Sequence, residues 1–519
     1  MYIEPNTNIR ILKDAPLDKT FDHTIYFENA STQATYFMGL QKYNLNNYTY
    51  QRVKRGYARV GIKADNLYDC NYMMFQNNSY GNKWFYAFIT SVEYLNNECS
   101  QIEFEIDVMQ TWFFDYSVDQ CFVEREHSVT DNIGDNIAPE SLATGEYVFN
   151  SYTPMIENMS DICVIVAIVD VSGESSAVDG KIYDGIYGGA TLWVYGIDNF
   201  NAINQKLTEY VQKPESVVSM YVMPKHFLPN GEIPENNKMV NNNKAVNELH
   251  LDSAITTNDK LNGYKPKNNK LYTYPYNFYH VDNGGSSSLS LRYEFFNDLQ
   301  PIISIDCNVT QPITVTARPR GYKGTTELNT EIISLTNYPL CSWNVDTYSA
   351  WVAQNSVLLA SGIGSALGGI AIGGLMGGVG GAMSGTINAI SNVTNLLAQD
   401  YQASIKADMI KGNAQGSLNV SAKKQQFYRG RLSVTSEYAK IIDDYFTRYG
   451  YSTKRLKVPN RNSRPHWNYV KTVGCTVTGS IPSDDMRLIC SIYDTGITFW
   501  KNGAEIGNYS LDNSPQGGE

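Results

Sequence analysis

Three carboxylates at alternate positions are the first residues of this 519-residue chain whose types and spacing could do chemistry. Glu103, Glu105 and Asp107 lie within Gln101–Val108, where the sequence QIEFEIDV alternates apolar and polar residues. The alternation predicts a half-buried strand with all three carboxylates on one face. Paired carboxylates can catalyse glycoside hydrolysis or bind a hard cation. We favour a solvated sheet face, because strand alternation by itself produces such rows.

The same acidic face would have another use if it lined a channel. Its negative charge would repel phosphates, so DNA could slide past without being gripped. We therefore keep Glu103, Glu105 and Asp107 as the candidate lining of a tube lumen.

Other catalytic patterns are absent from the sequence. No GxxxxGK[ST], GxGxxG, GxSxG or HExxH motif occurs. The six histidines are isolated, and His127, which closes the charged string VEREH at Val123–His127, could act as a base. We favour ion pairing of this string within a sheet or at an interface. The eight cysteines form no CxxC pair and show no metal-like spacing to the histidines, so we expect reduced, buried thiols. The sequence predicts neither an enzyme nor a bound metal or cofactor.

Composition limits the classes of partner. The net charge of −11 and the pI of about 5.2 argue against a protein that coats nucleic acid, which needs a dominant basic surface. DNA could still pass along the chain without sequence-specific binding. The opening residues MYIEPNTNIRILKD contain no uninterrupted apolar segment typical of a secretory signal, and the mean hydropathy of −0.33 argues against a polytopic membrane protein. We expect synthesis in the cytoplasm.

Hydrophobic periodicity predicts a mainly β, α+β protein in four parts. Residues 1–145 are β-rich, and residues 146–345 form a mixed middle region with long loops. Residues 346–400 are a charge-free, glycine-rich apolar loop, and residues 401–519 are β-structure with one amphipathic helix.

The middle region contains the strongest strand signal. Ile162–Val171 is almost continuously apolar, as in a strand buried on both faces. Strands at Leu192–Val194 and Val217–Met223 enclose a helix that Asp198 caps and Pro214 stops, which predicts a local β-α-β unit. Residues 225–270 are rich in Asn, Lys and Pro and predict long exposed loops. A further strand is predicted where apolar residues alternate at Leu289, Leu291, Tyr293 and Phe295.

The C-terminal part contains an amphipathic helix at Thr435–Tyr449 and a predicted β-hairpin at Tyr493–Ser510. Gly450 occupies the position of a C-terminal glycine cap. The predicted apolar face of the helix consists of Tyr438, Ile441, Ile442, Tyr445 and Tyr449.

Tyr445–Ser483 contains no acidic residue. Aromatic residues Trp467 and Tyr469 lie among its cations, a composition that nucleic-acid-binding surfaces also have. We favour a seam between subunits, in which this basic stretch meets an acidic neighbour. Its cations are Arg448, Lys454, Arg455, Lys457, Arg461, Arg464 and Lys471.

The most unusual segment is Thr347–Gln399, which contains no Asp, Glu, Lys, Arg or His. Uncharged apolar runs longer than about 18 residues are typical of membrane spans. Glycines recur at four-residue spacing, as in Gly373, Gly377 and Gly381, which allows close packing between helices in lipid. Burial of the segment within its own domain is the alternative. The residues expected to enter a membrane are Leu358, Leu359, Ile363, Gly364, Leu367, Gly368, Gly369, Ile370, Ile372, Gly373, Gly374, Leu375, Met376, Gly377, Val379, Gly381, Met383 and Gly385.

Several stretches together resemble the distal tail tube, or tail knob, proteins of phi29-like podophages. The match is specific at both ends of the chain, and the glycine-rich apolar stretch falls between the two groups, as it does in that family. The matching stretches are NIRILKD (Asn8–Asp14), MFQNNSYGNKWFYAF (Met74–Phe88), FEIDVMQTWFF (Phe104–Phe114), VEREH (Val123–His127), RYGYSTKRLKVPN (Arg448–Asn460), NYVKT (Asn468–Thr472) and GITFWKNGAEIGNYS (Gly496–Ser510).

This resemblance implies a virion protein at the tip of a short tail, where a homohexamer forms a β-rich tube next to the upper tail and collar proteins. It implies that the apolar loops plug the tube, then enter the host cytoplasmic membrane and open a path for the genomic DNA. Two other functions stay open. The Tyr- and Asn-rich middle region could recognise a host-surface glycan, or the three carboxylates could belong to a cell-wall hydrolase.

Overall fold

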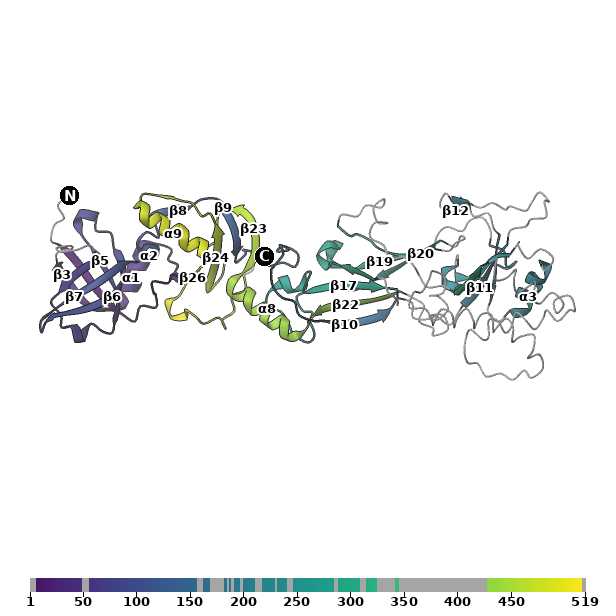
Figure 1. Ribbon diagram of the computed structural model, residues 1–519, viewed down its shortest axis with the longest axis horizontal. Helices are drawn as coiled ribbons and strands as arrows, with labels where there is room; N and C mark the ends of the chain where they lie inside the picture. The colour runs from purple at the N-terminus through teal and green to yellow at the C-terminus, as the bar shows by residue number, and fades with distance from the viewer. Residues whose placement is uncertain are drawn as a thin grey trace. The chain divides into compact units, whose positions relative to one another are not determined.

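The structure is a computed structural model that describes residues 6–48, 56–155, 162–168, 182–183, 186–187, 191–196, 199–210, 217–228, 231–239, 246–283, 288–308, 314–323, 341–344 and 427–515. These residues form many strands and few helices, which confirms the predicted mainly β class (Figure 1). The residues group into two compact units. The first unit takes Met1–Gly145, Gly263–Thr273 and Thr435–Glu519, and the second takes Glu146–Asn262 and Tyr274–Val434. The four-part division made from the sequence stays a prediction.

One six-stranded antiparallel sheet occupies the N-terminal part of the first unit, in the order β3-β1-β5-β6-β7-β4. One face buries apolar side chains such as Ile11 and Phe75. The other face packs on α1 (Ala30–Gly39), where the ring of Phe37 stacks on Tyr72 with 5.3 Å between centroids. Asn29 begins α1 by accepting a hydrogen bond from the Thr32 N–H. The strands are β1 (Thr7–Lys13), β3 (Gln41–Tyr48), β4 (Tyr57–Val60), β5 (Cys70–Gln76), β6 (Phe85–Asn96) and β7 (Cys99–Ile106).

A second sheet of the first unit combines residues from both ends of the chain, in the order β2-β26-β24-β9-β23. The strand β2 pairs in parallel with β26, and the other pairs are antiparallel. The helix α9 (Ser483–Thr495) lies against β24, and Ile489, Ile492 and Tyr493 enter the core beneath it (Figure 1). The strands are β2 (His23–Ile25), β9 (Cys121–Glu126), β23 (Tyr451–Lys457), β24 (Trp467–Val473) and β26 (Ile497–Trp500), with a small separate pair of β8 (Tyr116–Val118) and β25 (Val477–Gly479).

The two sheets of the first unit share one topology. In the first sheet, the chain runs from β1 through α1 to β3, β5 and β6, with β2 before α1 and β4 after β3, and four of these strands pair in the order β3-β1-β5-β6. In the second, β9 is followed by α8 (Ser436–Tyr449) and then by β23, β24 and β26, which pair in the order β23-β9-β24-β26. Every pair in both series is antiparallel. The first unit therefore contains the same strand–helix–strand arrangement twice, and the second copy is interrupted by the long excursion between β9 and α8.

The second unit contains the predicted β-α-β unit. The strand β11 (Ile162–Ile168) is central and buried, and it pairs antiparallel with both β14 (Thr191–Gly196) and β15 (Val217–Pro224). The helix α3 (Phe200–Glu209) connects β14 to β15, which are therefore parallel to each other. The predicted capping residue is wrong by one position, because Asn199 accepts the hydrogen bond from the Ala202 N–H.

Two further sheets and a short pair complete the second unit. A four-stranded sheet has the order β10-β22-β17-β18, and a three-stranded sheet has the order β16-β19-β20. Their strands are β10 (Tyr147–Pro154), β22 (Tyr428–Val434), β17 (Asn277–Asp282), β18 (Ser288–Leu291), β16 (Val246–Leu251), β19 (Ile302–Asn308) and β20 (Thr314–Pro319). The strand β21 (Cys341–Asn344) pairs with β15 in the sheet of β11. The short pair consists of β12 (Ile182–Tyr183) and β13 (Ile186–Tyr187).

Two predicted strand regions differ from the structure. The strand expected to continue through Tyr293 and Phe295 ends at Leu291, because Tyr293–Phe295 turns into a short 3-10 helix. The expected hairpin at Tyr493–Ser510 is one strand, since Tyr493 belongs to α9 and β26 is followed by the 3-10 turn Gly503–Glu505.

The buried face of α8 is also rotated from the predicted one. Ile441 is 66% exposed, whereas Ala439, Ile442, Asp443 and Phe446 are buried. A hydrophobicity pattern misplaces this face because Asp443 enters the interior with its own hydrogen-bond donors. The region 225–270, predicted as exposed loops, likewise contains β16 and the buried side chains of Phe227, Leu228, Met239, Ile255, Leu261 and Lys270.

Candidate functional sites

The predicted membrane-inserting residues, from Leu358 to Gly385, lie outside the described residues. Their insertion stays a prediction. Within the described ranges, no helix has the length and apolar character needed to cross a membrane.

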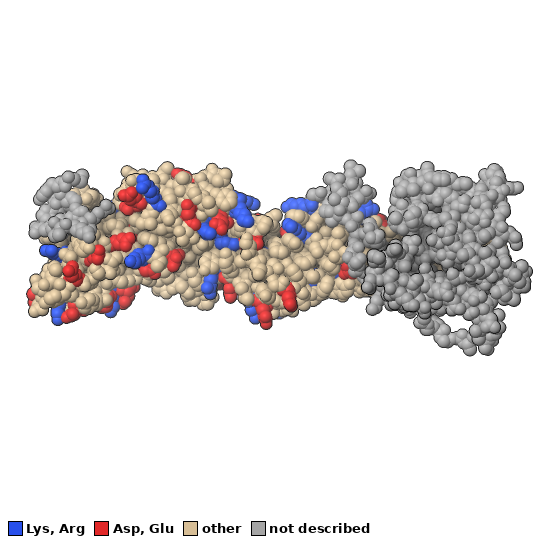
Figure 2. All heavy atoms as spheres, in the orientation of Figure 1, with Lys and Arg blue, Asp and Glu red and all other residues tan. Residues whose placement is uncertain are grey.

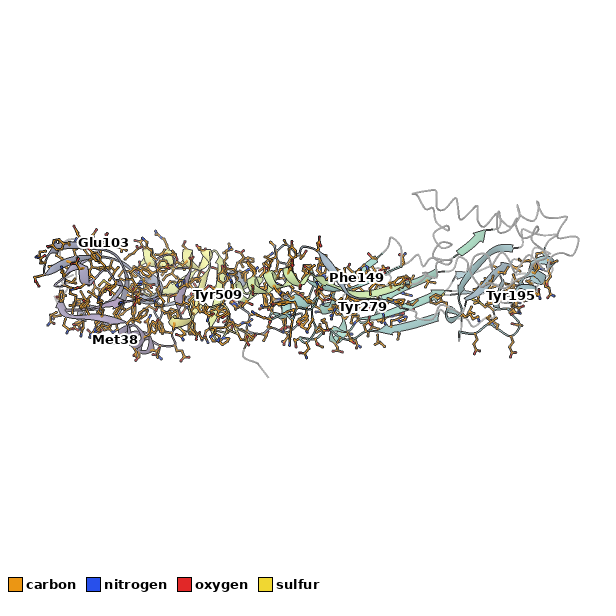
Figure 3. All side chains as sticks on the ribbon, turned by 90° about the horizontal axis from the view of Figure 1, so that it is seen from below. Met38, Glu103, Phe149, Tyr195, Tyr279 and Tyr509 are labelled. Atoms are coloured by element: carbon orange, nitrogen blue, oxygen red, sulfur yellow. The ribbon has the colours of Figure 1, made fainter. Side chains whose placement is uncertain are left out.

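The acidic strand places its carboxylates in different environments. Glu103 on β7 is half-buried and accepts hydrogen bonds from the Tyr57 hydroxyl at 2.8 Å and the Ser91 hydroxyl at 3.0 Å (Figure 3). Glu105 is exposed two residues further along the strand. Glu103 and Glu105 therefore share the sheet face that points away from Ile102 and Phe104 in the core.

Asp107 does not lie on that face. The strand ends at Ile106, and Asp107 begins the short helix α2 (Val108–Thr111) by accepting a hydrogen bond from the Gln110 N–H. Its side chain also accepts from the Tyr72 hydroxyl at 2.8 Å and is 2% exposed. Burial raises the pKa of Asp107 to about 6. Asp107 supports the core, so the predicted acidic face keeps only Glu103 and Glu105, and its place in a lumen stays a prediction.

The basic stretch is divided between the interior and the surface of the first unit. Arg464 is buried at 4% exposed, and Arg461 lies against the ring of Phe113. Lys457 pairs with Glu126 at 2.5 Å, and Lys471 pairs with Glu124 at 2.9 Å. Arg448 is exposed, and its guanidinium lies over the ring of Tyr509. Lys454 and Arg455, both on β23, are exposed and have no carboxylate partner in the part of the chain that the structure describes. Lys454 and Arg455 are adjacent on one strand, and the seam between subunits stays a prediction.

A buried ionic cluster joins segments that are far apart in the sequence. The Glu140 carboxylate, with a side chain 1% exposed, accepts from Arg125, from Lys270 at 2.5 Å and from the Ser452 N–H at 2.8 Å. Arg125 also donates to the Gly450 carbonyl oxygen at 2.6 Å. Burial lowers the pKa of Lys270, and the nearby Glu140 carboxylate opposes that shift. This cluster was not predicted from the sequence, because Glu140 and Lys270 lie in segments that show no hydrophobic periodicity.

A second buried carboxylate holds the segment Gly263–Thr273 to α8. Asp443 accepts hydrogen bonds from the Tyr264 hydroxyl at 2.7 Å, the Lys267 N–H at 2.7 Å, and both the N–H and the side-chain amide of Asn268. Burial raises the pKa of Asp443, and these donors act against the shift. The sequence does contain a sign of this role: Asp443 and Asp444 lie in the middle of the predicted helix, where Asp is unfavourable unless its side chain has a specific partner.

His127 has a structural role, as the sequence analysis favoured. Its ring Nδ1 accepts a hydrogen bond from the Tyr469 N–H at 2.8 Å, and the ring Nε2–H donates a hydrogen bond to the Thr447 carbonyl oxygen at 3.1 Å. Burial, together with the nearby charges of Arg464 and Arg125, lowers the pKa of His127 to about 3. A ring held neutral in this way connects β9, β24 and α8. In the described residues, no group of three or more His, Cys, Asp and Glu side chains has a geometry that could hold a metal ion.

Two family models match different parts of the chain. Residues 237–514 match the family model for the C-terminal domain of the tail knob protein gp9 of Bacillus phage phi29. Residues 5–117 match the N-terminal region of caudoviral major tail proteins.

The curated relatives extend over nearly the whole chain. The chain is 27% identical to the tail knob protein gp9 of Bacillus phage phi29 and 26% identical to that of Bacillus phage B103, and each alignment covers 98% of both proteins. Among solved structures, the tail knob protein gp12 of bacteriophage C1 matches with a TM-score of 0.60 over 98% of this chain and 99% of that one. At a sequence identity of 14%, this structural match shows a shared fold and nothing more.

We predict that Asp443→Asn destabilises the first unit by about 2–4 kcal/mol, because the new amide N–H₂ would face donors that now have a carboxylate acceptor. Urea unfolding, together with hydrogen exchange of residues 263–273, measures the change. The matched control is Asp444→Asn on the same helix, where the side chain is exposed and a change within about 0.5 kcal/mol is expected. Equal effects of the two substitutions would contradict the role of Asp443.

His127 should make the first unit sensitive to acid. Below pH 6.5 the unfolded chain binds a proton on this ring that the folded chain excludes down to about pH 3, so stability falls as the pH falls through this window. The slope from this residue is at most about 1.4 kcal/mol per pH unit. Unfolding curves of wild type and His127→Gln between pH 7 and 4 test it: the difference in stability between the two proteins should shrink as the pH falls. A difference that does not depend on pH would refute the assignment.

Proposed function

This chain belongs to the family of the phi29 tail knob protein, and on that premise we propose that it forms the distal tail tube as a homohexamer whose apolar loops open the host membrane. Its general role is that of a structural component of the phage tail, located in the virion at the tail. Other tail proteins are its partners in that assembly, and we infer that these are the upper tail and collar proteins.

The observation that carries the membrane proposal is the charge-free segment Thr347–Gln399. In a closed tube, apolar loops from several copies would cover each other's surfaces and plug the exit. Once expelled into water, the same surfaces would be driven into a bilayer by the hydrophobic effect. The glycines at four-residue spacing favour close contacts between the loops of different copies.

We assign the tube wall and its lumen to the β-rich first unit. Glu103 and Glu105 share one sheet face, and we assign this face to the lumen. Carboxylates along the wall would keep the DNA phosphates from binding, so the genome would pass without sequence-specific contacts. The activity is mechanical, and no catalytic residue is assigned, which agrees with the structural role of the relatives.

Electron microscopy combined with liposome leakage tests this function. The purified chain should form hollow six-fold rings and release an encapsulated dye. A variant in which residues 361–385 are replaced by a Gly/Ser/Asn linker of the same length should keep the rings and lose the leakage, since only the apolar segment has changed.

A matched control replaces Gly364, Gly369, Gly373, Gly377 and Gly381 with alanine, which preserves the apolar character. Reduced leakage in this control would support close packing of glycines between loops. Stable monomers, or leakage that survives the linker replacement, would reject the proposed function.

A second candidate function, recognition of a host glycan, is favoured by exposed aromatic rings in the second unit. Tyr147, Phe149 and Tyr152 of the edge strand β10 are 41%, 45% and 45% exposed (Figure 3). The Tyr152 hydroxyl donates to the Asp282 carboxylate, which lies 3.2 Å from the His280 ring. Aromatic faces next to polar groups are suited to the apolar and hydroxyl surfaces of a sugar ring.

Glycan-array binding by the full chain tests this candidate. Phe149→Ala and Tyr152→Ala should each reduce the signal at least about tenfold if the rings stack on the sugar, as the loss of one buried aromatic contact implies. Leu249→Ala, an exposed apolar residue of β16, serves as the control. Wild-type protein that binds no glycan, or variants that bind as wild type does, would exclude the site.

A further inference from the structure

An exposed row of apolar side chains crosses the second sheet of the first unit. The register of the sheet puts Leu456 of β23 opposite Phe122 of β9, and Phe122 opposite Val473 of β24. These three side chains are 69%, 37% and 54% exposed, respectively. We call them the apolar row. Adjacent apolar side chains that stay in water on a folded unit are typical of a surface that another protein covers.

Two unpaired cations precede the apolar row on β23, which is an edge strand of its sheet. The register puts Arg455 opposite the buried Val123, so its side chain leaves the sheet on the other face from Leu456, and both Lys454 and Arg455 are exposed at the edge. A bulge between Ser452 and Arg455, with Lys454 at φ 50°, interrupts the pairing with β9 here. Neither cation has a carboxylate partner among the described residues, in contrast to Lys457 and Lys471. This edge is both basic and apolar.

The end of the β6–β7 hairpin has the opposite charge. Its residues 93–98 are all exposed, and Tyr94 and Leu95 are 55% and 37% exposed. Glu93 and Glu98 lie at this end, and neither makes an ion pair in the described part of the chain. Glu93 accepts a hydrogen bond from the Gln101 side chain across the hairpin, which holds it near Tyr94. On the face drawn in Figure 2, acidic and basic side chains are interspersed over the surface of the described residues. We call residues 93–98 the acidic tip.

The two surfaces satisfy the requirement for a ring of identical chains. Such a ring uses a head-to-tail interface, so each chain must present two different surfaces that complement each other. The acidic tip and the basic, apolar edge of β23 each combine exposed apolar side chains with unpaired charges of opposite sign. A surface that contacted its own symmetry mate would instead bring like charges together, which costs affinity.

We propose that the basic edge of β23 and the apolar row of one copy receive the acidic tip of the neighbouring copy. Leu95 and Tyr94 of the tip would cover Phe122, Leu456 and Val473, while Glu93 and Glu98 would pair with Lys454 and Arg455. The assignment rests on the proposed function to the extent that the assembly is a closed ring, and it adds the surfaces that close it.

Charge reversal tests the interface directly. In the double variant Lys454→Glu with Arg455→Glu, the β23 edge and the tip are both acidic. In the double variant Glu93→Lys with Glu98→Lys, both surfaces are basic. Each double variant should need at least about tenfold more protein than wild type to form rings, because like charges then meet at the interface. A 1:1 mixture of the two double variants should restore rings of alternating chains, since each tip then meets an edge of opposite charge. A chain that carries all four substitutions should also form rings.

The control Lys19→Glu with Lys501→Glu makes the same change in net charge as Lys454→Glu with Arg455→Glu, at exposed positions that belong to neither surface, and its rings should persist. Thermal unfolding of each variant monitors the fold, and the mixture keeps the proposal testable even if one variant is less stable. Rings in both double variants alone, or no rings in the mixture, would overturn the proposed contact. If the wild-type protein forms rings, either of these two results would reject only the proposed contact and not the proposed tube. If the wild-type protein forms no rings, the proposed function itself is rejected.

Discussion

Buried carboxylates that collect donors from distant segments are the constraint on which the first unit depends. Asp443 receives a hydroxyl, two backbone N–H groups and a side-chain amide from Gly263–Thr273, and Glu140 receives two cations and the Ser452 N–H. A buried carboxylate without such partners is costly, because burial removes its solvation. Each carboxylate therefore stabilises its site only when all the segments are in place, and this couples their folding.

The second copy of the repeated topology also requires segments that are far apart in the sequence to fold together. The strand β9 completes its sheet only by pairing with β23 and β24, and Arg125 and the Gly450 carbonyl that it contacts are 325 positions apart. Pairing across such a separation carries a large loop-closure entropy, although this cost grows only slowly with length. The ionic cluster around Glu140 and the neutral ring of His127 lie at the point where β9 meets α8 and β23, and they help to offset that cost.

The arrangement of charge connects the fold to assembly. Most cations of the basic stretch are used within the first unit, by Glu126, Glu124 or aromatic rings, and Lys454 and Arg455 remain on an exposed edge. The acidic tip belongs to the other copy of the repeated topology. In a tube of identical chains, the two copies within one unit can therefore take different parts in the contact with the next chain. The net charge of −11 says little about such a surface, because interfaces depend on where the charges lie.

The sequence by itself determined the helices and strands that depend on interactions between residues close together in the chain. The alternation in β7, the apolar run of β11, the helix α8 with Gly450 after it and the β-α-β unit were all predictable from periodicity and capping signals. The sequence was also sufficient to indicate the family, because the matching stretches form the two sheets of the first unit. The charge-free segment with its glycines is likewise a property of the sequence, and its part in the membrane is a proposal.

Tertiary structure alone decided which polar side chains are inside. Asp107 looked like a member of an acidic row, but the strand ends one residue earlier and the carboxylate caps α2 in the core. Asp443 turns the buried face of α8 away from Ile441, and Lys270 is buried in a segment that composition marks as a loop. The hydrophobic pattern of a segment measures only the transfer of its own side chains from water. A charged side chain can be buried when hydrogen-bond partners from distant segments replace that water, and those partners are brought together only by the fold.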